Sequence, residues 1–292
     1  LKNLSGKFSF INGDLQSEPL TASWFNQPLN VDFSTKEGAK AYQVAVNLNG
    51  NWQPAKTGVL PEAVNEALNG SVAWDGKVGI ELPYHAGATY NVELNGDLKN
   101  VSSHLPSPLA KPAGEPLPVN VKVDGNLNSF ELTGQAGADN HFNSRWLLGQ
   151  KLTLDRAIWA ADSKTLPPLP EQSGVELNMP PMNGAEWLAL FQKGAAESVG
   201  GAASFPQHIT LRTPMLSLGN QQWNNLSIVS QPTANGTLVE AQGREINATL
   251  AMRNNAPWLA NIKYLYYNPS VAKTRGDSTQ SSPFPTTERI NF

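Results

Sequence analysis

A chain of 292 residues can hold one large domain or two ordinary ones, so the size of the core is not limiting. Only 15% of the residues are charged, against a usual share of about 25%, and the net charge is −3 without a basic run, which excludes the phosphate-neutralising surface of a nucleic-acid-binding protein. The chain has no cysteine, which excludes a thiol catalyst, a disulfide and a cysteine-ligated zinc.

Apolar and polar residues alternate along much of the chain. This is the two-residue period of a β-strand with one apolar and one polar face. The first long run sets Leu29, Val31 and Phe33 against Asn30 and Asp32. Comparable runs, in chain order, are Tyr42 to Leu48, Tyr90 to Leu94, Val119 to Val123 and Glu245 to Arg253. Each run predicts a strand whose apolar side chains share one face.

Pairs of Asn or Asp followed by Gly occur between these runs. Such pairs favour tight hairpin turns, because both residues tolerate a positive φ angle. The pairs are Asn12-Gly13, Asp75-Gly76, Asn95-Gly96, Asp124-Gly125 and Asn235-Gly236. Closely spaced strands joined by such turns predict an antiparallel meander and no β–α–β units.

Two proline-rich segments and two short helices interrupt the alternation. Residues 105–118 and 166–170 cannot be central strands, because proline cannot donate to the hydrogen-bond ladder, so we expect crossings or edge segments. A helix over 61–68 is favoured by its leading proline. A second helix is predicted near 183–193, with Asn183 as a possible N-cap.

No residue pattern points to catalysis, a metal or a cofactor, and we expect none of them. The four histidines are scattered without metal-ligand spacing, and the carboxylates do not form the pair that a glycosidase needs. Eight tryptophans leave a carbohydrate-stacking surface open, with packing at strand ends as the alternative.

Several segments of the chain resemble the AsmA-like family of Gram-negative envelope proteins. The segments that carry the resemblance are Leu4–Phe10, Gly13–Leu15, Gln27–Val31, the proline-rich His104–Glu115, Gly243–Leu250 and Lys263–Leu265. Their order, with the proline-rich stretch and the predicted helix between them, makes the resemblance specific, and it covers essentially the whole chain.

The resemblance implies a periplasmic segment of an inner-membrane-anchored protein that moves phospholipid between the inner and outer membranes. The anchor is expected outside this segment. The implied fold is all-β, an antiparallel meander of one-sided strands curled into an elongated open groove, with one or two short α-helices. Acyl chains would lie on the apolar floor of the groove, and no catalytic residue is required.

The expected organisation follows from the same resemblance. It comprises a first β-groove section over 1–163, a Pro/Gly-rich connection over 164–206 with the helix near 183–193, a second β-groove section over 207–269, a flexible segment over 270–287, and the start of a further strand at 288–292.

The apolar sides of the alternating runs supply the predicted lipid-binding floor. Its residues are Phe8, Phe10, Leu29, Val31, Phe33, Tyr42, Val44, Val46, Leu48, Val92, Leu94, Val119, Val121, Val123, Ile246, Ala248, Leu250 and Met252. The predicted helix carries Trp187, Leu188, Leu190 and Phe191, which either form a possible gate or pad a sheet. A closed β-sandwich with a structural or carbohydrate-binding role would show the same alternation and is the alternative.

Overall fold

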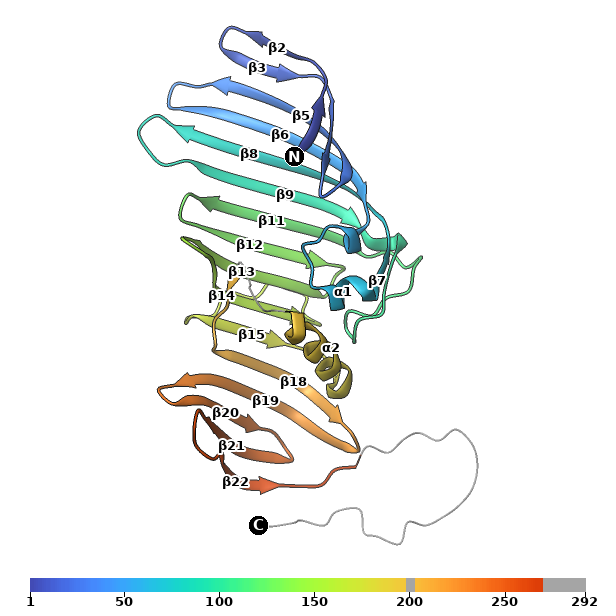
Figure 1. The fold of residues 1–292 in the computed structure, drawn as a ribbon, viewed down its shortest axis with the longest axis vertical. Coiled ribbons are helices and arrows are strands. Elements are labelled where there is room, and N and C mark those ends of the chain that lie inside the picture. Colours follow the sequence, from blue (N-terminus) through green and yellow to red (C-terminus); the bar gives the residue numbers. More distant parts are fainter. Residues whose placement is uncertain (198–202, 270–292) are drawn as a thin grey trace.

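The computed structural model describes residues 1–197 and 203–269, and most of its regular structure is β-sheet. A 20-stranded sheet runs through the described residues, and most of its strands lie across the long axis of the molecule in the order of the sequence (Figure 1). The sheet twists, and its first and last strands do not meet. This confirms the predicted all-β fold with an open sheet. The predicted flexible segment and the strand at 288–292 lie outside the described residues.

The strands of the large sheet fall into two groups in chain order. The first group is β1 (Lys2–Ser5), β2 (Phe8–Ile11), β3 (Asp14–Ser17), β4 (Leu20–Trp24), β5 (Gln27–Glu37), β6 (Ala41–Trp52), β8 (Val72–Pro83), β9 (Thr89–Asp97), β11 (Pro118–Asn126), β12 (Ser129–Ala136), β13 (Asn140–Leu148) and β14 (Leu152–Ala161). The second group is β15 (Gly174–Asn178), β16 (Met182–Asn183), β17 (Ala203–Ser204), β18 (Ile209–Leu218), β19 (Gln221–Thr233), β20 (Gly236–Gln242), β21 (Ile246–Arg253) and β22 (Leu259–Leu265).

The remaining elements lie outside this sheet. They are the 3₁₀ helices η1 (Pro54–Lys56) and η2 (Leu98–Asn100), the helices α1 (Glu62–Ala67) and α2 (Gly184–Glu197), and the two-stranded sheet of β7 (Leu68–Gly70) and β10 (Val101–Ser103). Both predicted helices are thus present. Asn183 caps α2 as expected, because its Oδ1 accepts a hydrogen bond from the Ala185 amide at 3.1 Å.

Two of the five predicted glycine turns are confirmed and three are wrong. Asn12-Gly13 joins β2 to β3, and Asn235-Gly236 lies at the turn from β19 to β20. The other three pairs lie inside β8, β9 and β11. Glycine has a packing role there: a Cβ at Gly125 would lie 2.5 Å from the ring of Tyr90, so the missing side chain leaves room for that ring.

One part of the sheet is parallel, which corrects the prediction of a meander without β–α–β units. β14 pairs with β15 and β15 pairs with β18 in parallel, and α2 connects the last two. Residues 162–173 cross from β14 to β15 over the sheet, where Pro167 O and Pro170 O accept hydrogen bonds from Asn143 and Arg156. Alternation reports the faces of a strand but not its direction, so the sequence could not reveal this.

The proline-rich segments take the places predicted for them. Residues 166–170 lie in the crossing between β14 and β15, and residues 105–117 lie outside every strand of the large sheet. Pro118 is the first residue of β11, a position at which proline removes little from the ladder.

Buried apolar residues form two small clusters and no continuous core. One joins β4, β5 and β6 through Ala22, Leu29, Val31 and Trp52. The other lies beneath α2 and comprises Ala161, Met179, Met182 and Trp187. Within the described residues no second large sheet covers the first, so the β-sandwich alternative is wrong.

Candidate functional site

Pairing register shows that apolar side chains form rows along the sheet, because directly paired residues of neighbouring strands point to the same face. One row consists of Phe33, Val46, Val78, Val92, Val123 and Leu132. The adjacent row consists of Val31, Leu48, Gly76, Leu94, Val121, Gly134, Phe142 and Trp159. Because the strands lie across the long axis, both rows run along it (Figure 1).

The second row continues through the parallel section to the last strand. Its further members are Leu177, Leu211, Ile228, Ala241, Ala248 and Ile262. We call the side of the sheet that carries these rows the apolar face. At the usual spacing of about 4.8 Å between strands, the run from β5 to β22 is about 60 Å long.

The apolar face is covered only in part. Val44, Val46 and Leu48 in β6 are half-buried, although a second layer over them would bury them fully. Coverage is densest at the cluster around Leu29, which is 2% exposed, and it is much weaker at the last strand, where Ile262 is 43% exposed. Uncovered apolar surface of this length is unusual in a soluble protein and indicates an interaction site.

All of the residues predicted as the groove floor lie on the apolar face. By register the set comprises Phe8, Phe10, Leu29, Val31, Phe33, Tyr42, Val44, Val46, Leu48, Val92, Leu94, Val119, Val121, Val123, Ile246, Ala248, Leu250 and Met252. Phe8 and Phe10, in the edge hairpin, are the most exposed of them, at 66% and 67%. That these residues bind lipid stays a prediction.

Sequence analysis missed several members of the apolar face. Val78 and Ile80 in β8 alternate with polar or small residues, a signal that could have been found, but the glycines of that strand obscured it. Phe142 and Trp159 were missed because β13 and β14 carry buried residues on both faces. Strands of that kind lose the alternating pattern.

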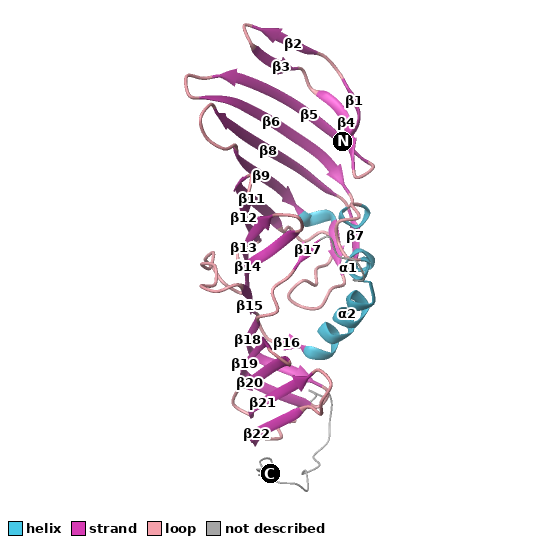
Figure 2. Cartoon of the chain, turned by 60° about the vertical axis from the view of Figure 1, so that its left-hand side comes forward, coloured by secondary structure: helices cyan, strands magenta, loops and turns pink. Residues whose placement is uncertain are grey.

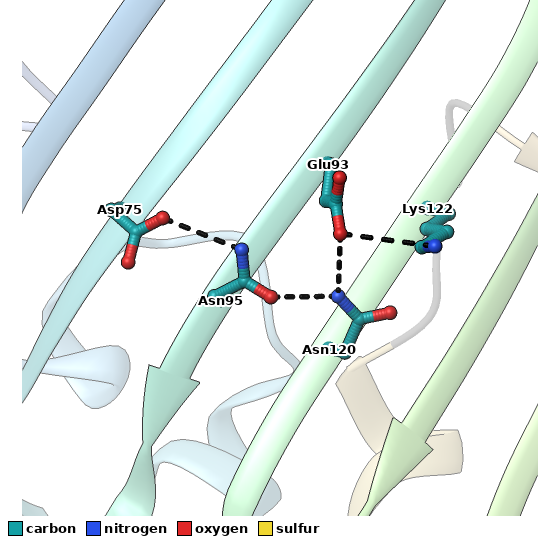
Figure 3. Close-up of polar contacts among 5 residues, drawn as sticks. All are labelled: Asp75, Glu93, Asn95, Asn120 and Lys122. Carbon is teal, nitrogen blue, oxygen red and sulfur yellow. Dashed lines mark hydrogen bonds and ion pairs between the residues drawn. The ribbon is translucent and has the colours of Figure 1, made fainter.

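The opposite face carries cross-strand polar pairs (Figure 3). Asn120 Nδ2 donates to Asn95 Oδ1 at 2.7 Å, and Asn95 Nδ2 donates to Asp75 Oδ2 at 3.3 Å. Glu93 Oε1 accepts from Asn120 at 3.3 Å and lies 3.8 Å from Lys122 Nζ. Surface pairs of this kind add little stability, but they show that this face is polar and suited to contact with water.

A loop covers the middle of the apolar face. Residues 98–117, called the roof below, fold back over β11 to β14, and β10 within them pairs with β7. β7, α1 and α2 lie together on one side of the sheet (Figure 2). Between the roof and the sheet lies a cavity of about 480 Å³. Its apolar lining includes Leu105 and Leu109 from the roof and Val121, Leu132, Phe142 and Trp159 from the sheet.

The residues of the predicted gate helix divide between two sides of α2. Trp187, only 8% exposed, packs against the sheet with Leu190, and its Nε1 donates to Ser107 O in the roof at 3.0 Å. Leu188 and Phe191 are 49% and 60% exposed. The helix therefore pads the sheet and holds the roof, while its role as a gate stays a prediction.

Four aromatic rings gather at one end of β4, β6 and β8. Trp52 lies 4.7 Å from Trp74 and 6.0 Å from Trp24, measured between ring centroids, and Phe25 stacks on Trp24 at 4.9 Å. Trp52 Nε1 donates to Pro28 O at 2.6 Å. These rings pack on one another at strand ends, which is the alternative to a sugar-stacking surface.

In residues 1–197 and 203–269, no three or more His, Cys, Asp or Glu side chains come together as a metal site. In the same residues, no helix combines the length and the apolar character needed to cross a membrane.

Comparison with known proteins gives a family match over the whole chain. The family model described as YhdP protein matches residues 1–291. The chain is 98% identical over 292 residues to a protein of Escherichia coli (strain K12) named intermembrane phospholipid transporter YhdP. The match covers all of this chain and 23% of that relative. No solved structure matches the chain.

Proposed function

The chain belongs to the YhdP protein family, and on that premise we propose that this segment shelters the acyl chains of phospholipids that move between the inner and outer membranes. The segment then lies in the periplasm, as part of a longer protein anchored in the inner membrane. Its work is physical transfer, for which no catalytic residue is needed.

The observation that carries this proposal is the continuous, half-covered apolar face. Each methylene group removed from water on it gains about 0.8 kcal/mol. Contacts of this kind have no preferred direction, so an acyl chain can slide from one row position to the next without breaking a specific bond. The phospholipid headgroup stays in water at the open side of the groove, since a charged group cannot enter the apolar rows cheaply.

The proposed contact residues are the predicted floor set together with Val78, Ile80 and Leu132. They are supported by register, because Val78 lies between Val46 and Val92 in one row and Leu132 extends that row. Most of them are half-buried and Phe8 and Phe10 are exposed, which leaves surface for a ligand, whereas Leu29 and Val31 are buried. The polar pairs of the opposite face indicate that this side faces water during transfer.

Charged substitutions test the proposal in a full-length family member that carries this segment. Val44→Asp and Leu250→Asp place a carboxylate in the path of the acyl chains, and an unpaired charge in apolar surroundings costs several kcal/mol. We expect phospholipid transfer to fall about tenfold or more, since each 1.36 kcal/mol is a factor of ten.

Matched controls use the opposite face of the same strands. Ala45→Asp and Thr249→Asp add the same charge beside the tested positions but outside the apolar rows. Normal transfer by both apolar-face variants, in protein shown to be folded, would reject the proposal.

A further inference from the structure

We propose that the cavity beneath the roof is a partly enclosed site for one acyl chain, through which a phospholipid passes on its way along the groove. This inference rests on the proposed function and adds to it a site with a defined place and size. Away from the roof and α2 the apolar face is open on one side, whereas here the roof covers it.

The cavity lies directly in the path of the rows. Val121, Gly134 and Phe142 are successive members of the second row, and all three line the cavity. An acyl chain that follows this row therefore enters the space between the sheet and the roof.

The size of the cavity fits a single chain. Its volume of about 480 Å³ falls within the range of about 300–1,000 Å³ that is usual for small-molecule sites. A cavity of this size between the roof and the sheet has room for a hydrocarbon chain.

The lining favours hydrocarbon over other ligands. Most of the lining side chains are aliphatic or aromatic. Of the charged side chains that line it, Lys111 is turned to the protein itself, because its Nζ donates to Val101 O and Pro112 O, both at 2.9 Å. The lining also includes the polar residues Ser103, Glu115, Gln135, Asn140 and His141, so the preference for hydrocarbon rests on the larger share of apolar side chains.

The roof is held in place, so the cavity exists before a ligand arrives. Asp97 Oδ1 accepts hydrogen bonds from the amides of Lys99 and Leu117, at 2.9 and 2.8 Å, and so joins the two ends of the roof. Trp187 fixes its middle through Ser107 O. A preformed site loses less entropy on binding than one that must be ordered.

Photo-crosslinking in cells tests this site in a full-length family member. A photoreactive amino acid is placed at Leu109, which lines the cavity, at Ala113, an exposed roof residue outside the lining, and at Val44 in the open groove. We expect phospholipid to be captured at Leu109 and Val44 and not at Ala113. Capture at Val44 without capture at Leu109 would overturn this site and leave the proposed function intact. Absence of capture at both would overturn the two together.

A filled cavity provides the second measurement. Gly134→Met directs a side chain into the cavity, and its Cβ meets no atom nearer than 3.8 Å, so the strand can accept it. Displacing a few methylene groups of the ligand should lower capture at Leu109 about tenfold. Thr133→Met, on the opposite face of the same strand, should leave capture unchanged. Unchanged capture in a folded Gly134→Met protein would overturn the proposal.

Discussion

At the scale of single residues, Glu245 is a buried carboxylate held by amide donors. It is 5% exposed, and its side chain accepts from the Asn224 amide at 2.6 Å, from Asn224 Nδ2 at 2.8 Å and from Asn268 Nδ2 at 3.2 Å. These bonds tie β19 to the segment that follows β22. Glu245 therefore braces the last strands of the sheet.

Removing this brace should loosen that end of the sheet. In Glu245→Ala several donors lose their acceptor, at about 1–3 kcal/mol each, so we expect local opening to become easier by about 2–4 kcal/mol. Hydrogen-exchange mass spectrometry of the full-length protein would show faster exchange in peptides covering 221–226 and 264–268. Glu245→Gln keeps one acceptor and should lose less. Equal exchange in wild type and Glu245→Ala would show that the brace does not act.

At the scale of elements, the roof depends on a glycine in β7. Gly70 has a φ angle of +114°, and a Cβ there would overlap the carbonyl oxygen of Asn100, next to β10. β7 and β10 approach this closely only because the side chain is missing.

Gly70→Ala should therefore separate the roof from its partner strand. Clash and strain together predict a loss of more than about 3 kcal/mol in the local stability of the roof. The expected sign is rapid hydrogen exchange within 98–117. Gly58→Ala is the matched control: its φ angle is +68° and no atom lies within 4 Å, so the cost should be only about 1 kcal/mol. Similar effects of the two variants would contradict this account of the roof.

α2 and the roof form one covering layer through Trp187. Replacing Trp187 by Ala removes a buried ring and its hydrogen bond, which should destabilise the layer by about 3–5 kcal/mol. Trp187→Phe removes the hydrogen bond but keeps a ring and should cost about 1 kcal/mol.

Limited proteolysis of the full-length protein can measure this difference, because cleavage follows the population of the opened loop. We expect rapid cutting within 104–109 in Trp187→Ala and slower cutting in Trp187→Phe. Leu188→Ala, at an exposed position of the same helix, should behave as wild type. Slow cutting in Trp187→Ala would show that α2 does not hold the roof.

At the scale of the whole molecule, the sequence predicted the faces of the strands better than their arrangement. The period of two depends only on each strand itself, so Tyr42 to Leu48 and Val119 to Val123 could be assigned to one face without knowledge of their neighbours. The parallel pairing of β14 with β15 depends on the path of residues 162–173 across the sheet, and tertiary contacts set that path. Gly125 gave a turn signal but lies under Tyr90, a contact between neighbouring strands that local pattern cannot report.

The candidate site divides in the same way. Rows of half-buried apolar residues could be anticipated from alternation, while the roof and its cavity could not. Leu105 and Leu109 stand in a proline-rich segment without periodicity, and only the folded chain brings them over Val121. The continuation of the second row through the parallel section also depends on pairing register. The sequence of β15 alone could not predict it, because this strand has only five residues.

Continuity along the molecule is the central claim, and crosslinking at three distant points tests it most directly. A photoreactive amino acid is placed at Val44, Val121 and Leu250 on the apolar face, and at Gln43, Lys122 and Thr249 on the opposite face as controls. We predict capture of phospholipid at the first three positions and at none of the controls. Equal capture on both faces, or no capture at any position of the folded full-length protein, would contradict a lipid path along this sheet.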